Sequence, residues 1–174
     1  MKKILLIAAI VGAALAGCSK DNGGEEPQVT NSYTYDGQVF EVKWARGVYV
    51  TNGDGSQSVV IGLCPVVPAG SSIWDEPDLL VIGVWDDLLG QKASFNQSYD
   101  KNYALSGDLA IGGTYYGFGD ESYPSNANLS GSDNWVQLTK QSDGTFTLEF
   151  SVVLYGKPFT GKCSGIQEDD GWWY

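Results

Sequence analysis

The C-terminal part of the chain alternates apolar and polar residues over three consecutive runs, and this alternation constrains the fold most strongly. The runs cover 135–141, 145–155 and 158–164, and they are separated by Ser142-Asp143-Gly144 and by Gly156-Lys157. A period of two places every second side chain on one face of a β-strand, and short loops containing glycine connect antiparallel neighbours. The stretch therefore predicts a three-stranded antiparallel meander, which we expect to be the folding core.

The loop lengths predict how these strands pair. A three-residue loop ending at Gly144 pairs Leu138 with Leu148, and a second turn at 156–157 pairs Leu154 with Phe159. The predicted core face consists of Val136, Leu138, Phe146, Leu148, Phe150, Val152, Leu154, Phe159 and Cys163.

Earlier in the chain, short runs rich in Val, Ile, Thr and aromatic residues are cut by Gly, Asn and Asp, which is typical of β-strands joined by turns. Asp36-Gly37 predicts a two-residue hairpin turn that pairs Tyr33 with Phe40. The second strand of this hairpin is expected over 38–45, with Trp44 on the same face as Phe40.

The run 79–85 is apolar at every position apart from Gly83, so we expect a central strand that is covered on both faces. The chain shows no convincing amphipathic helix. Together the runs predict an all-β domain, an antiparallel β-sandwich or flattened β-barrel of about eight to ten short strands. The aromatic residues at 172–174 are expected to cap the open end of the sandwich, and the alternative is an exposed contact patch.

The first 17 residues have the pattern of a secretory signal. Lys2 and Lys3 precede an apolar run of 12 residues, 4–15, which is too short for a bilayer core that takes about 20 residues to cross. The stretch Leu15-Ala16-Gly17-Cys18 resembles the lipobox of bacterial lipoproteins, and this resemblance implies cleavage before Cys18 and acylation of its thiol, with palmitate among the chains. Several acyl chains hold a protein stably at a membrane.

The residues that follow Cys18 are polar and acidic. Ser19 to Pro27 resembles the signal that sends lipoproteins of the Bacteroidota to the cell surface, so the resemblance implies an outer-membrane lipoprotein that faces the exterior. The composition is also that of a flexible linker. We expect a signal peptide at 1–17, a flexible tether at 18–30 and a single all-β domain at 31–174. The small lipoproteins that the chain resembles carry uncharacterised all-β domains.

Charge and composition exclude several functions. The chain of 174 residues carries a net charge of −11, and without the signal eight basic residues face 21 acidic ones. Binding of nucleic acid takes a basic surface, so nucleic acid is not an expected partner. The absence of histidine removes Ser-His-Asp and Cys-His catalysis and the usual zinc sites. We expect no cofactor, no metal site and no enzymatic activity.

Cys64 and Cys163 remain once Cys18 is acylated. An even number of thiols in an oxidising compartment makes this pair a candidate disulfide, which would close a loop of about 100 residues. The alternative is two separate buried thiols that act as small apolar side chains.

Aromatic residues in the expected loops are the candidate ligand-binding residues. Sugars present flat apolar faces that stack on aromatic rings, while amides and carboxylates bind their hydroxyl groups. The candidates are Trp74, Tyr115, Tyr116, Phe118 and Tyr123. They favour a non-enzymatic binding or accessory protein, with glycan as the candidate ligand and the membrane reached through Cys18.

Two alternatives remain. The first is a structural or adhesive surface component, in which an exposed edge strand joins a partner protein by strand addition. The second is a small glycosidase with two carboxylates, for which the acids at 75–78 and 86–87 are the available groups. Acids at the ends of an apolar strand more often keep it soluble, which makes catalysis the weaker interpretation.

Overall fold

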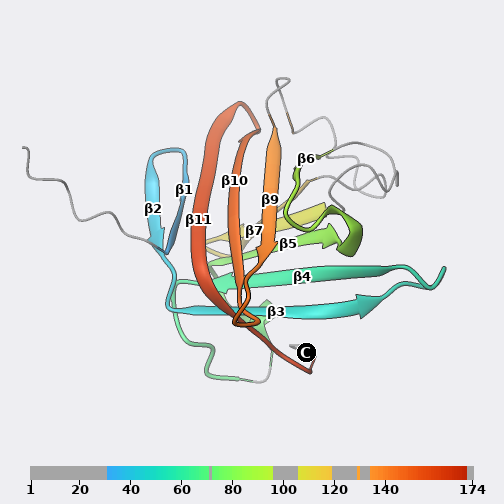
Figure 1. Cartoon of the computed structure of the whole chain (residues 1–174). Coiled ribbons are helices and arrows are strands. Elements are labelled where there is room, and N and C mark those ends of the chain that lie inside the picture. The colour runs from blue at the N-terminus through green and yellow to red at the C-terminus, as the bar shows by residue number, and fades with distance from the viewer. Residues whose placement is uncertain (1–30, 71, 96–105, 119–128, 130–133, 172–174) are drawn as a thin grey trace, which may run out of the picture.

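The computed structural model describes residues 31–70, 72–95, 106–118, 129 and 134–171, and most of them belong to β-strands. Eleven strands form one strongly curled mixed sheet, a half-barrel (Figure 1). Two single turns of 3-10 helix, η1 (Ile73–Asp75) and η2 (Asp86–Leu88), flank the fifth strand. No helix within these ranges is long and apolar enough to cross a membrane. The all-β prediction is confirmed.

Six strands form the first half of the sheet and stand upright in Figure 1. In spatial order they are β6 (Lys92–Ser94), β9 (Trp135–Lys140), β10 (Phe146–Leu154), β11 (Lys157–Glu168), β1 (Ser32–Tyr35) and β2 (Gln38–Glu41). All neighbours in this half are antiparallel.

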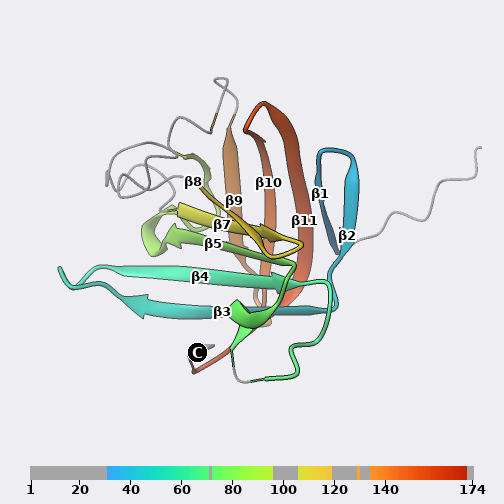
Figure 2. The same ribbon diagram turned by 180° about the vertical axis from the view of Figure 1, so that it is seen from behind.

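Five strands form the second half and run crosswise to the first, as Figure 2 shows from behind. In spatial order they are β3 (Trp44–Thr51), β4 (Gln57–Cys64), β5 (Leu79–Trp85), β7 (Ser106–Ile111) and β8 (Thr114–Phe118). Each residue of β5 is buried, so the expected central strand is confirmed.

One strand, β11, belongs to both halves. Its first part pairs with β10 and β1, and its end pairs with β3 through Gln167 and Glu168. Between these parts Gly165 adopts a φ of +68°, and the register to β10 shifts, which bends the strand. The contact with β3 is parallel, so the sheet is mixed and the expectation of purely antiparallel strands is wrong at this point.

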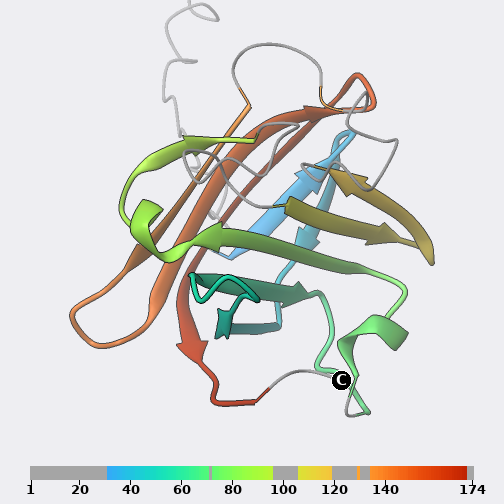
Figure 3. The ribbon, with the colours of Figure 1, turned by 90° about the vertical axis from the view of Figure 1, so that its right-hand side faces the viewer.

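The curl of the sheet encloses the main core, as the view along the molecule in Figure 3 makes clear. A continuous series of aromatic rings crosses this core from the surface inward, with centroids 5.2–5.9 Å apart between successive rings. In order these rings are Tyr155, Tyr116, Tyr35, Phe159, Phe118 and Phe95. β8 and β1 lie on either side of the opening of the half-barrel and are not hydrogen-bonded neighbours among the described strands. They are joined there by contacts between aromatic side chains.

The predicted meander is confirmed, including its first register. Leu138 lies opposite Leu148, and every residue of the expected core face is buried. The hairpin at Asp36-Gly37 likewise pairs Tyr33 with Phe40. These pairings depend on loop length and alternation, which are local properties of the sequence.

The second meander turn is displaced from its predicted place. Tyr155 and Gly156 form the turn, both with positive φ, so Leu154 pairs with Lys157 and Val152 pairs with Phe159. The predicted pairing of Leu154 with Phe159 is therefore wrong. The partner of Phe159 is shifted by two residues along β10, from Leu154 to Val152. A shift by an even number keeps the same side chains on the core face.

The expected strand over 38–45 divides into β2 and β3. Val42 and Lys43 redirect the chain between them, and the N–H of Lys43 donates to the carbonyl of Cys64 at 2.9 Å. Trp44 consequently packs against a second, smaller buried cluster on the other side of the sheet, and not beside Phe40. This division contributes to a strand count above the expected eight to ten. The aromatic residues at 172–174 lie outside the described ranges.

Candidate functional site

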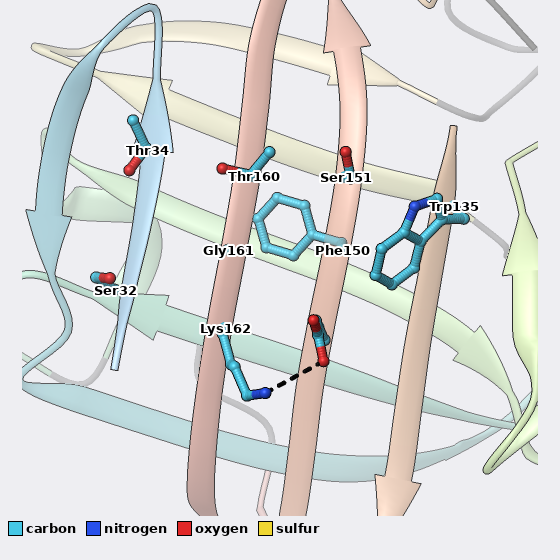
Figure 4. Close-up of a pocket in the computed structure, with 9 residues that line it drawn as sticks. Ser32, Thr34, Trp135, Phe150, Ser151, Thr160, Gly161 and Lys162 are labelled. Carbon is cyan, nitrogen blue, oxygen red and sulfur yellow. Dashed lines mark hydrogen bonds and ion pairs between the residues drawn. The ribbon is translucent and has the colours of Figure 1, made fainter. Parts of the chain in front are cut away.

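The outer face of the first half of the sheet carries a shallow groove of about 360 Å³, which we call the polar groove. It lies over β1, β11, β10 and β9, whose inward side chains form the main core (Figure 4). Because side chains alternate along a strand, the residues between the core positions point outward. Seven outward residues line the groove: Ser32, Thr34, Trp135, Glu149, Ser151, Thr160 and Lys162. Phe150 and Gly161, at core positions, complete its lining.

The register of the four strands aligns the outward residues into rows. Thr34 pairs with Thr160, Thr160 with Ser151, and Ser151 with Trp135. Three hydroxyl groups and an indole thus form one line across four strands, which we call the hydroxyl row. Neighbouring strands lie about 4.8 Å apart, so the row extends over about 14 Å.

A second row runs parallel to the first and carries charge. Ser32 pairs with Lys162 and Lys162 with Glu149, and the Lys162 ammonium lies 3.4 Å from a carboxylate oxygen of Glu149 (Figure 4). Both side chains of this ion pair are largely exposed, so its contribution to stability is small. The pair instead presents a donor and an acceptor side by side beside the hydroxyl row.

Trp135 forms one end of the hydroxyl row and is held from its outer side. The ammonium of Lys92, on the neighbouring strand β6, lies 3.6 Å from the centroid of the indole ring. A cation at this distance over an aromatic face is attracted to the ring electrons. Trp135 lines the groove and Lys92 does not. Lys92 therefore contributes to the groove through its contact with the indole ring.

The groove rests on a tightly packed support. A Cβ atom on Gly161 would lie 2.4 Å from a ring carbon of Phe150, so only glycine leaves room for that ring beneath β11. Phe150 in turn packs against Phe159, with ring centroids 4.7 Å apart. The strands that carry the two rows are therefore held in fixed register by the core below them.

Two predicted ligand-binding residues lie together, away from the polar groove. The hydroxyl of Tyr115 donates to the backbone carbonyl of Trp74 at 2.7 Å, and both rings are exposed, Tyr115 to 50% and Trp74 to 41%. The N–H of Gly112 donates to a carboxylate oxygen of Asp78 at 2.9 Å, which ties the β7–β8 turn to the same loop. One of the acids considered for catalysis therefore has a structural role.

The other predicted ligand-binding residues do not lie with Trp74 and Tyr115. Phe118 is buried in the main core, so its assignment as a ligand-binding residue is wrong. Tyr116 is half-buried between Tyr35 and Tyr155, on the opposite face of β8 from Tyr115. Tyr123 lies outside the described residues.

Cys64 and Cys163 are both buried and both free, so the candidate disulfide is not formed in this structure. Cys163 lies in the main core, whereas Cys64 belongs to the second cluster with Ile73 and Leu79. Burial raises the pKa of the Cys64 thiol to about 12 and that of Cys163 to about 11. These values are typical of unreactive thiols that serve as small apolar side chains.

The described residues include no group of three or more acidic or cysteine side chains placed to hold a metal ion. Glu149 is the one carboxylate among the described residues that line the polar groove. Glycoside hydrolysis commonly uses two carboxylates about 5–9 Å apart across the substrate. The described lining of the groove therefore offers hydroxyl groups, one ammonium group and one carboxylate for hydrogen bonding.

The sequence prediction missed every residue of the polar groove. The signal was present in the meander, whose outward positions carry Ser, Thr, Glu, Lys and Trp, but aromatic ligand-binding residues were expected in loops and not on a strand. The alignment with Ser32 and Thr34 also depends on β1 lying beside β11, a contact between distant parts of the chain.

Comparison with family models, with curated proteins and with solved structures finds no match to this chain.

Proposed function

We propose that this protein is a surface-anchored, non-enzymatic lipoprotein that binds neutral glycans in the polar groove. The observation that carries the proposal is the hydroxyl row, in which Thr34, Thr160 and Ser151 lead across the sheet to Trp135. The groove is open along this line, so a chain of sugars lies across the strands rather than being enclosed.

The chemistry of a sugar matches both parts of the groove. The C–H face of a pyranose ring stacks on the indole of Trp135, where burial of apolar surface and the ring electrons favour contact. Each sugar hydroxyl both donates and accepts, and the hydroxyl row offers groups that do the same. Glu149 accepts and Lys162 donates, so the charged row suits neutral hydroxyl groups without selecting an ionic ligand.

Truncation of the indole tests this function. We expect Trp135→Ala to weaken binding of neutral oligosaccharides by about 10- to 100-fold, since loss of one stacked ring removes about 1.4–2.8 kcal/mol. Titration calorimetry with gluco-, manno- and xylo-oligosaccharides measures the change. Trp74→Ala is the matched control, because that indole is exposed and lies outside the groove. Equal affinity of Trp135→Ala and the unmodified protein would contradict the proposal.

The anchor in this proposal is the acylated Cys18. The linker composition of residues 18–30 then separates the groove from the bilayer. We expect Cys18→Ala to move the protein from the membrane fraction to the soluble fraction, because the acyl chains supply the membrane affinity. Fractionation and the mass of the N-terminal peptide measure this. Membrane recovery equal to that of the unmodified protein would rule out the anchor.

The alternative role, strand addition to a partner protein, is favoured by one observation. β8 ends the sheet among the described strands, and its sequence, Thr-Tyr-Tyr-Gly-Phe, contains no charged residue or proline. Edges of sheets are usually protected by such residues. If a partner protein binds by strand addition at β8, we expect Tyr115→Lys to release that partner. The same substitution is expected to leave the affinity for oligosaccharides unchanged.

A further inference from the structure

Three tyrosines gather at the opening of the half-barrel, away from the polar groove. Tyr116 on β8 lies between Tyr35 on β1 and Tyr155 in the β10–β11 turn, with ring centroids 5.7 and 5.5 Å apart. We call Tyr35, Tyr116 and Tyr155 the tyrosine cluster. Tyr35 follows Thr34 on β1, so the cluster and the hydroxyl row lie on opposite faces of that strand.

Tyr155 occupies a backbone position that is costly for its residue type. Its φ is +52°, in the left-handed region, where glycine, asparagine and aspartate are the usual residues and a bulky side chain costs free energy. The equivalent position of the β1–β2 turn has the same φ and carries Asp36. The Tyr155 ring contacts that of Tyr116, and 46% of the residue remains exposed. Residues held in such conformations concentrate at functional sites.

The two turns beside the cluster are joined to one another. The N–H of Asp36 donates to the carbonyl of Pro158 at 3.0 Å, and the Asp36 carboxylate pairs with the ammonium of Lys157. Lys157 also lies 5.9 Å from the ring centroid of Tyr35. An acceptor and a donor of opposite charge are thus fixed beside three aromatic rings, with no net charge between them.

We propose that the tyrosine cluster is a second carbohydrate-binding site, in which the apolar face of a neutral sugar ring stacks on Tyr155 and Tyr116. Asp36 accepts from the sugar hydroxyls and Lys157 donates to them. A purely apolar ligand would gain nothing from this ion pair, and an ionic ligand would gain little net attraction because it meets both charges. The site rests on its own residues and stands independently of the polar groove.

The test uses the opposite effects of one substitution on stability and on binding. Asparagine suits the left-handed conformation, so Tyr155→Asn is expected to keep or raise the melting temperature. In the Trp135→Ala background, where the groove is disabled, we expect it to reduce the remaining affinity for neutral trisaccharides at least tenfold. Tyr155→Phe, which keeps the ring, is expected to bind within threefold of its parent.

Each arm of this experiment addresses one site. Complete loss of binding in Trp135→Ala alone, or equal trisaccharide affinity of Trp135→Ala with and without Tyr155→Asn, would overturn the second site. A lowered melting temperature for Tyr155→Asn would show that the ring serves the fold, and would overturn it as well. If Trp135→Ala bound trisaccharides as tightly as the unmodified protein while Tyr155→Asn lost that binding, the polar groove would be excluded as the binding site. The same result would support the tyrosine cluster.

Discussion

Replacing Phe159 with alanine is expected to destabilise the domain by about 3–5 kcal/mol, a large part of the stability of a single domain. Phe159 is fully buried, and its ring contacts those of Tyr33, Tyr35, Phe118 and Phe150, with centroids 4.7–6.3 Å away. The substitution removes both the buried apolar surface and the packing of four neighbours around it. Urea unfolding measures the change, and the melting temperature is expected to fall by on the order of 10 °C.

The matched control is Tyr115→Ala, which truncates an aromatic side chain that is half exposed. Its expected cost is about 1 kcal/mol, for the lost contact with Trp74 and little burial. Similar losses of stability in the two variants would contradict the role of Phe159 as the centre of the aromatic core.

Alkaline solution is expected to destabilise this protein progressively above pH 9. Burial raises the pKa of Cys64 from 9.0 to about 12, with Glu76 adding to the effect, and raises that of Cys163 from 9.0 to about 11. Above pH 9 the unfolded chain releases protons that the native chain retains, so stability is complete below pH 9 and falls as the pH rises. By pH 11 the expected loss is about 2–3 kcal/mol for each thiol.

Urea unfolding at pH 8, 9, 10 and 11 measures this loss of stability. Burial also raises the pKa of the Tyr33 hydroxyl, which adds to the loss above pH 10. Cys64→Ala is the control: it lowers stability at pH 8 but makes the decline with pH shallower by about one proton. Parallel pH profiles for this variant and the unmodified protein would contradict the assignment of the loss to the buried thiols.

The local features of the fold could be predicted from the sequence. Leu138 and Leu148 pair as expected because a three-residue loop leaves one register in which both apolar faces agree. The turn at Tyr155 was not predicted because tyrosine rarely adopts a positive φ, and Gly156 occupies the second position of the turn rather than the first. The chain adopts the costlier turn and keeps all apolar residues on the core face.

The long-range features could not be predicted in this way. Nothing near Gln167 indicates that it lies parallel to Arg46, and nothing near Thr160 indicates that Thr34 is its neighbour. The polar groove depends on the second of these contacts, so its residues became a site only when the strands were placed side by side. Trp74 and Tyr115, selected by composition, do meet, but at a different place on the molecule.

The position of β11 has a consequence for the order in which the chain acquires its structure. This strand holds the two halves of the sheet together, yet it is the last of the described strands in sequence and pairs with β1, the first of them. During synthesis the two halves lack their shared strand until β11 emerges, and closure then joins segments more than 120 residues apart. Such distant contacts form slowly. For the membrane anchoring proposed above, a domain that stays open until β11 has been made can still be threaded through a membrane.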